Sequence, residues 1–133
     1  MKTPDTWERV LHCADAALGR KAADLVVLDI AAISSVADYF VICSGRSDTQ
    51  VQAIADAIEH RLRRAGHRPL AVEGRERGQW ILLDYGDVVV HVFYAPVREF
   101  YDLERLWSRA TRVPLPAELL GPPAGERSAT GAE

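Results

Sequence analysis

Two short apolar runs constrain the fold of this chain more than any other feature. They occupy residues 25–30 (LVVLDI) and 39–44 (YFVICS), and both are rich in β-branched and aliphatic side chains. A strand with one solvated face alternates apolar and polar residues, whereas a strand covered on both faces is continuously apolar. Each run therefore predicts a buried strand in a sheet with helices packed against it. Neither run approaches the roughly 18 residues that a membrane span needs.

Two helical patterns accompany these runs. The first starts at Thr3 and Pro4, a capping residue and a residue suited to the first turn, and continues with apolar residues on one face. The second follows the second run, where Ser47 and Gln50 have the spacing of a capping box and Gly66 is placed to end the helix. Both patterns predict amphipathic helices.

Three further strands and a third helix complete the predicted order. The strands cover residues 69–72, 80–85 and 88–93. Gly86 and Asp87 form a two-residue connection between the last two strands, which is typical of a tight hairpin. A single helix is expected over residues 98–110, where apolar residues recur at helical spacing. The predicted fold is α/β (α+β), a mixed five-stranded sheet with flanking helices.

The chain divides into a folded part and a tail. Residues 1–112 are predicted to form one domain, and residues 113–133 a disordered C-terminal tail. The tail holds four prolines, three glycines and no aromatic residue, so it lacks the apolar surface that would offset the entropy of ordering. Charged residues stand near the N-terminus where a secretory signal needs its apolar stretch, which predicts a cytoplasmic location and no membrane anchor.

The charge balance argues against a nucleic-acid-binding protein. The net charge is −3, and residues 1–112 carry 15 basic and 16 acidic side chains, whereas a protein held to nucleic acid by neutralising its phosphates usually carries a basic excess. The basic residues Arg61, Arg63, Arg64 and Arg68 do cluster around the end of the second helix. A solvated helix end is the favoured interpretation, and an RNA-contacting edge is the alternative.

No catalytic or metal centre is predicted. The turn from Gly45 to Ser47 precedes a helix, where it could hold a phosphate, but a turn with a helix cap is the simpler interpretation. Asp84 and Asp87 are separated by the hairpin turn, so they cannot form the pair of metal-binding carboxylates that a nucleotidyltransferase needs. We expect no cofactor, because neither a Walker loop nor a dinucleotide fingerprint occurs.

Three other residues with reactive side chains have structural interpretations. Cys13 and Cys43 stand thirty positions apart, which excludes a zinc site built from close ligand pairs and favours two buried thiols. His91 shares its predicted strand face with apolar neighbours, so we expect a hydrogen-bonded histidine within the sheet rather than a general base.

Aromatic residues gather in the last third of the folded part. Trp80, Tyr85 and Tyr101 are the candidates for a partner-binding surface, since large aromatics with a polar atom are common anchors of protein interfaces. The strand period of two places Trp80 and Tyr85 on opposite faces of the sheet. They can contact the same partner only if strand twist, or a position at the edge of the sheet, turns both side chains toward one surface.

Long segments of the chain resemble the ribosomal silencing factor family, also called RsfS or Iojap. The likeness covers about residues 5–107, and it is carried by residues 38–56 (DYFVICSGRSDTQVQAIAD), 78–93 (GQWILLDYGDVVVHVF) and 98–107 (REFYDLERLW). The resemblance implies a nucleotidyltransferase-like fold that lacks the catalytic carboxylates. It also implies a non-enzymatic role in which the protein binds large-subunit ribosomal protein fourteen, sterically blocks joining of the ribosomal subunits and represses translation under nutrient limitation.

The family pattern also bears on site residues and on the alternatives. The interface aromatics of the family fall at Trp80 and Tyr101, while Tyr85 stands where relatives often carry an aliphatic residue. Relatives in organelles are linked to assembly of the large subunit, and family members form homodimers, so both are implied here, with contact to ribosomal RNA secondary. A nucleotidyltransferase-like enzyme is the alternative from a different class, motivated by the fold and by the turn after Gly45.

Overall fold

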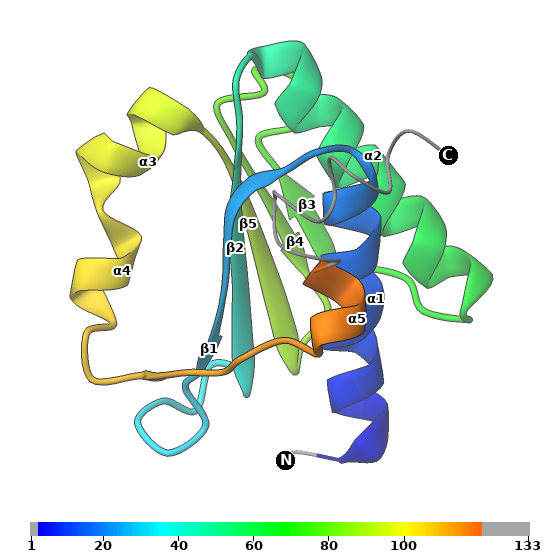
Figure 1. Cartoon of the computed structure of the whole chain (residues 1–133), viewed down its shortest axis with the longest axis vertical. Coiled ribbons are helices and arrows are strands. Elements are labelled where there is room, and N and C mark those ends of the chain that lie inside the picture. The colour runs from blue at the N-terminus through cyan, green and yellow to red at the C-terminus, as the bar shows by residue number, and fades with distance from the viewer. Residues whose placement is uncertain (1–2, 121–133) are drawn as a thin grey trace.

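A six-stranded mixed sheet forms the centre of the protein, with helices on both faces (Figure 1). The computed structural model describes residues 3–120. The strands lie in the order β3-β4-β5-β2-β1-β6. They are β1 (Ala23–Asp29), β2 (Tyr39–Gly45), β3 (Ala71–Glu73), β4 (Trp80–Asp84), β5 (Val88–Tyr94) and β6 (Thr111–Arg112). The predicted mixed sheet is confirmed, but it has six strands instead of five. The sequence does not predict β6, because its two residues are exposed and show no apolar pattern.

The two central strands, β2 and β5, form the parallel pair of the sheet. They align over seven residues each, from Tyr39 opposite Val88 to Gly45 opposite Tyr94. Every residue of β2 is buried, and so is every residue of β5 except Tyr94. This burial confirms the prediction from the apolar run at residues 39–44, because helices cover both faces of these strands. The same prediction for residues 25–30 is only partly right, since Val27 and Leu28 are the two buried residues of β1.

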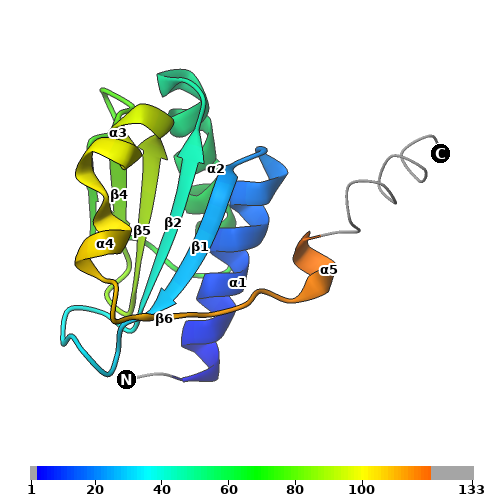
Figure 2. The same ribbon diagram turned by 60° about the vertical axis from the view of Figure 1, so that its left-hand side comes forward.

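Helices α1 and α2 cover one face of the sheet, and α3 and α4 cover the other (Figure 2). The helices are α1 (Pro4–Gly19), α2 (Asp48–Arg64), α3 (Ala95–Tyr101), α4 (Leu103–Leu106) and α5 (Ala117–Leu120). The predicted caps are in place: the Thr3 hydroxyl accepts from the Thr6 N–H, and the Ser47 hydroxyl accepts from the Gln50 N–H. The Gln50 side chain accepts from the N–H of Arg46 rather than that of Ser47.

Alternation along the strands gives the sheet two apolar cores. Toward α1 and α2, β5 contributes Val88, Val90 and Val92. Toward α3 and α4, the same strand contributes Val89 and Phe93, which pack with Phe40, Ile42 and Leu103. The two sets differ because successive strand residues point to opposite faces.

The segment after β5 folds as two short helices, so the prediction of a single helix over residues 98–110 is wrong. The backbone reverses at Asp102, whose φ of 47° lies in the left-handed region. This turn buries Leu103 against the sheet and leaves Phe100 and Leu106 exposed at 81% and 77%. Helical spacing alone predicts that all three lie in the core.

Residues 111–119 run round the β1 edge of the sheet and reach α1 (Figure 2). Strand β6 pairs with the end of β1, the Val113 N–H donates to the Val27 carbonyl at 2.9 Å, and Val113 and Leu115 pack against the core under α1. We call this segment the strap. The contacts of the folded part thus continue past residue 112, because the apolar side chains of Val113 and Leu115 pack against the core of the domain. The remainder of the predicted tail, residues 121–133, lies outside the described residues.

None of the helices within residues 3–120 is long and apolar enough to cross a bilayer.

The Asp87 side chain ties the β4–β5 turn to the first helix. The turn is the predicted two-residue hairpin, with the Tyr85 N–H donating to the Val88 carbonyl at 2.9 Å. The Asp87 carboxylate accepts the Thr6 hydroxyl at 2.8 Å and pairs with Arg9. Its backbone carbonyl accepts from two N–H groups at the start of β2. One residue therefore joins three elements that are far apart in the sequence.

We expect Asp87→Ala to lower the free energy of unfolding by about 2–3 kcal/mol, because it leaves the buried Thr6 hydroxyl and the Arg9 guanidinium without their shared acceptor. Denaturant titration of the purified protein measures the loss. The control is Glu8→Ala, which removes an exposed carboxylate from α1, the helix that carries Thr6 and Arg9. It should change the free energy of unfolding by less than about 0.5 kcal/mol. Equal losses in the two variants would contradict the assigned role of Asp87.

Candidate partner-binding surface

Two of the three predicted aromatics lie side by side on the α3 face of the sheet. Trp80 begins β4, and Tyr101 ends α3. Their ring centroids are 5.0 Å apart at an interplanar angle of 47°. Twenty residues separate them in the sequence, and they meet because α3 folds back over β4 and β5 after the chain leaves the sheet at Tyr94.

The indole of Trp80 is held from beneath by β5. Its ring stacks on Phe93 with centroids 4.9 Å apart, and its Nε1–H donates to Nδ1 of His91 at 3.1 Å. His91 is 4% exposed, and burial lowers its pKa to about 4. The imidazole is therefore neutral near pH 7, which lets Nδ1 accept a hydrogen bond. The expectation of a hydrogen-bonded sheet histidine is confirmed.

A pocket of about 450 Å³ opens beside these rings. It is lined by Gly74, Arg77, Gln79, Trp80, Pro96, Val97, Phe100 and Tyr101. The Phe100 ring packs edge-on against Tyr101, with centroids 5.1 Å apart, and the two side chains are 81% and 51% exposed. Adjacent exposed aromatics beside a pocket are typical of a surface that a partner covers. Phe100 was missed because helical spacing placed it in the core.

The loop before Trp80 is anchored to α2. Gly74 has a φ of 82°, and a Cβ there would overlap the Trp80 carbonyl oxygen. Arg75 pairs with Glu59, and the Gln52 amide donates to the Arg75 carbonyl at 2.9 Å. These contacts fix the point at which the chain enters β4, and with it the place of the indole.

Tyr85 does not belong to this surface. It is 9% exposed and packs in the core between the sheet and helices α1 and α2, on the face opposite Trp80. Its hydroxyl is buried without a hydrogen-bond partner among the described residues, and burial raises its pKa. Strand twist does not turn the Tyr85 side chain toward the face that carries Trp80. The assignment of Tyr85 to the same surface as Trp80 is therefore wrong.

The basic cluster also lies on the α2 side of the sheet, away from the aromatic pocket. Arg61 pairs with Asp15 at 2.6 Å, and Arg63 pairs with Glu59 at 3.1 Å. Arg64 and Arg68 are exposed. Acidic partners therefore reduce the positive field of the cluster, and none of its four arginines lines the pocket beside Trp80.

The positions that suggested an enzyme carry structural contacts. Ser47 caps α2, which confirms the simpler interpretation of the turn. Asp84 accepts the N–H of Gly86 at 2.8 Å, while Asp87 turns toward Arg9 in α1. Within residues 3–120, no three His, Cys, Asp or Glu side chains are grouped so that they could hold a metal ion.

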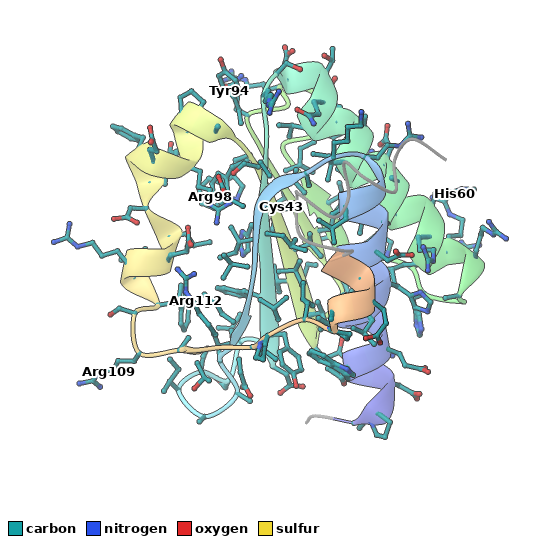
Figure 3. The ribbon with its side chains drawn as sticks, in the orientation of Figure 1. Cys43, His60, Tyr94, Arg98, Arg109 and Arg112 are labelled. Carbon is teal, nitrogen blue, oxygen red and sulfur yellow. The ribbon has the colours of Figure 1, made fainter. Side chains whose placement is uncertain are left out.

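Arg98 was missed by sequence reasoning and fixes α3 to the sheet. It reaches from α3 toward the β1 and β2 strands (Figure 3). Its guanidinium donates to Oγ of Ser44 at 2.9 Å, to the Asp24 carbonyl at 2.7 Å and to Glu104 at 3.0 Å. Two arginines, Arg98 and Arg112, line the pocket of about 620 Å³ beside it. Arg98 is bonded within the protein as described, and the exposed Arg112 pairs with Glu104 at 3.5 Å.

The two cysteines are buried and free, as predicted. Burial raises the pKa of Cys43 to about 12 and raises that of Cys13 as well. Both thiols are therefore protonated near pH 7, which makes them poor nucleophiles.

Fold and surface together define an α/β protein that has an exposed aromatic pocket and in which Ser47, Asp84 and Asp87 make structural contacts. The family model described as "Ribosomal silencing factor during starvation" matches residues 3–132. The chain belongs to this family, which confirms the resemblance found in its sequence.

Known proteins agree with this assignment. A ribosomal silencing factor RsfS of Bacillus subtilis (strain 168) is 48% identical over 91 residues, which are 68% of this chain and 77% of the relative. A crystal structure of a Chromobacterium violaceum protein has a TM-score of 0.76 and 35% identity, covering 81% of this chain and 88% of that one. A mouse (Mus musculus) protein named "Mitochondrial assembly of ribosomal large subunit protein 1" is 30% identical over 90 residues, 65% of this chain and 40% of its own length.

Burial of His91 predicts a loss of stability in acid. The folded protein keeps this imidazole neutral down to about pH 4, whereas the unfolded chain binds a proton below about pH 6.5. Stability is therefore lost as the pH falls through this window, by about 2 kcal/mol between about pH 7 and pH 5. Denaturant titrations at the two pH values should show that His91→Phe removes this part of the dependence.

The matched control is His60→Asn. His60 lies on the outer side of α2, away from the sheet (Figure 3). This variant should keep the acid dependence of the unchanged protein. The prediction fails if His91→Phe loses as much stability between the two pH values as His60→Asn does.

Proposed function

We propose that this protein binds the large ribosomal subunit through large-subunit ribosomal protein fourteen. Bound there, it occupies a surface that the small subunit needs, so the two subunits cannot join. Translation is then repressed when nutrients are limiting, and the site of action is the cytoplasm. No bond is made or broken, so the protein is a steric repressor and not an enzyme.

The observation that carries this proposal is the pairing of Trp80 with Tyr101 beside the aromatic pocket. An indole and a phenol in contact offer a large apolar area, and the phenol adds a polar atom for a hydrogen bond, whereas the indole N–H is bonded to His91. Tyr101 is 51% exposed, and its neighbour Phe100 is 81% exposed. Covering these rings with a partner removes apolar surface from water, which is the main favourable contribution in most protein interfaces.

The charge distribution supports a protein partner rather than RNA. Residues 1–112 are close to neutral, and the exposed arginines of the basic cluster lie on the α2 side of the sheet. A protein held mainly by phosphates would lose most of its affinity as salt rises. We therefore expect binding to the large subunit to depend only weakly on salt concentration.

Assembly of the large subunit is a second candidate function. It is favoured by the mouse relative, whose name states such a role in mitochondria. Both functions use the same partner, and they differ in the state of the subunit that is bound. Depletion of the protein from cells should leave mature large subunits unchanged if silencing is the main function, and should cause precursor particles to accumulate if assembly is.

The central test is co-sedimentation with separated large subunits on sucrose gradients. We expect Trp80→Ala and Tyr101→Ala each to weaken binding at least tenfold, because truncation of an aromatic anchor costs about 2 kcal/mol or more. Both variants should remain folded, since neither side chain belongs to the fully buried core. Unchanged affinity in both variants would show that the proposed surface is wrong.

Two controls are matched to this test. Leu70→Ala removes an apolar side chain that is 76% exposed and lies outside the pocket, and it should bind as the unchanged protein does. Tyr85→Phe removes only a buried hydroxyl and should also bind normally. Sedimentation velocity of the free protein shows whether a homodimer forms, and loss of that dimer in Tyr101→Ala would mean that self-association and ribosome binding use the same rings.

A further inference from the structure

We propose that His91 is a positioning residue for partner binding, and that it acts by holding the indole of Trp80 in a single orientation. The inference rests on the proposed function of Trp80, and it assigns a role to a side chain that the partner does not touch. His91 is 4% exposed, so it can act on a partner only through its neighbour.

The geometry fixes the indole at two points. In the β4–β5 ladder Trp80 stands opposite Phe93, and His91 stands opposite Leu82. His91 is therefore the diagonal neighbour of Trp80 on the same face, at the distance that long side chains bridge. Phe93 supports the ring by stacking, and Nδ1 of His91 holds the Nε1–H at 3.1 Å. Stacking alone allows two orientations of the ring, because a half-turn about the Cβ–Cγ bond returns the indole to the same plane with Nε1 on the other side, and the hydrogen bond selects one of them.

The donor of a half-buried indole does not need a protein acceptor. Water could reach the ring edge if the indole were turned outward, because Trp80 is half-buried and lines the pocket. In the structure the N–H points inward to the sheet, and the phenol of Tyr101 lies against the indole. The apolar part of the ring is thus the part that a partner can cover.

A histidine at position 91 leaves one buried polar atom without a hydrogen bond, which an apolar residue there would not do. Because Nδ1 accepts, the proton of the neutral ring is on Nε2. That atom is buried without a hydrogen-bond partner among the described residues. The imidazole packs against apolar rings, and its centroid is 4.7 Å from that of Phe40. A leucine or phenylalanine would fill this place without leaving a buried donor unpaired. The acceptor at Nδ1 is what the histidine adds.

When the indole is already fixed in the free protein, less side-chain entropy is lost on forming the complex. Immobilising one large side chain at an interface changes the dissociation constant by about 2- to 10-fold. We expect His91→Phe to weaken binding to separated large subunits by that factor. Phenylalanine keeps a flat ring between Phe40 and Phe93 and has no acceptor.

The matched variant is His91→Asn. Its amide oxygen is attached to Cγ, as Nδ1 is in histidine, so it can accept the same hydrogen bond. This variant should restore most of the affinity that His91→Phe loses. A role in packing predicts the reverse order, because asparagine fills the apolar site less well than phenylalanine does.

The second readout is the indole N–H resonance of Trp80 in a ¹H–¹⁵N correlation spectrum. The chain has three tryptophans, and the resonance that disappears in Trp80→Phe identifies the right one. His91→Phe should move this resonance and speed its exchange with water, while His91→Asn should leave both nearer to those of the unchanged protein. Should His91→Phe not fold, His91→Leu removes the acceptor in its place.

A double-mutant cycle separates positioning from a general effect on the fold. In the Trp80→Phe background there is no indole N–H to hold, so His91→Phe should cause no further loss of affinity. An equal loss in both backgrounds overturns the proposal, and so does an unchanged indole resonance in His91→Phe. If Trp80→Ala and Tyr101→Ala bind normally, the proposed function has failed, whereas normal binding by His91→Phe alone overturns only the role of His91.

Discussion

The parallel pairing of β2 with β5 is the constraint on which the rest of the structure depends. Both strands are buried on two faces, so the sheet needs a helical layer on each side. A parallel pair also needs a long connection, which α2, β3 and β4 supply. The alternation of β5 then sends Val90 and Val92 to one layer and His91 and Phe93 to the other. The support of the aromatic pocket is thus a direct result of this pairing.

Much of the fold could be predicted because its signals are local. The apolar runs at residues 25–30 and 39–44, the helix caps and the hairpin at Gly86 all depend on neighbours in the sequence. The break at Asp102 could not be predicted in this way, because its left-handed backbone is favourable only when Leu103 enters a core built by distant strands. The same holds for β6, whose two residues pair because β1 offers an edge.

The site shows the same division between local and distant information. Trp80 and Tyr101 could be chosen from their residue type, yet their contact depends on how α3 crosses the sheet. Tyr85 was assigned to the surface although the strand period already placed it on the other face, and the structure follows the period. Phe100 and Leu103 are three residues apart, and Arg98 and Glu104 are six apart. The break in the helix at Asp102 decides that Leu103 packs against the sheet while Phe100 stays exposed, and that Arg98 can bond to Glu104.

The strap has a further consequence for how this protein can recognise anything. It covers one half of β1 with β6, and the other half is distorted by a bulge at Asp24. The opposite edge of the sheet is β3, which has only three residues. Neither edge offers a long row of free backbone groups, so a partner cannot readily extend the sheet with a strand of its own. Recognition is left to side chains. Under the proposed function, the aromatic pocket must then supply the affinity that backbone pairing provides in other proteins.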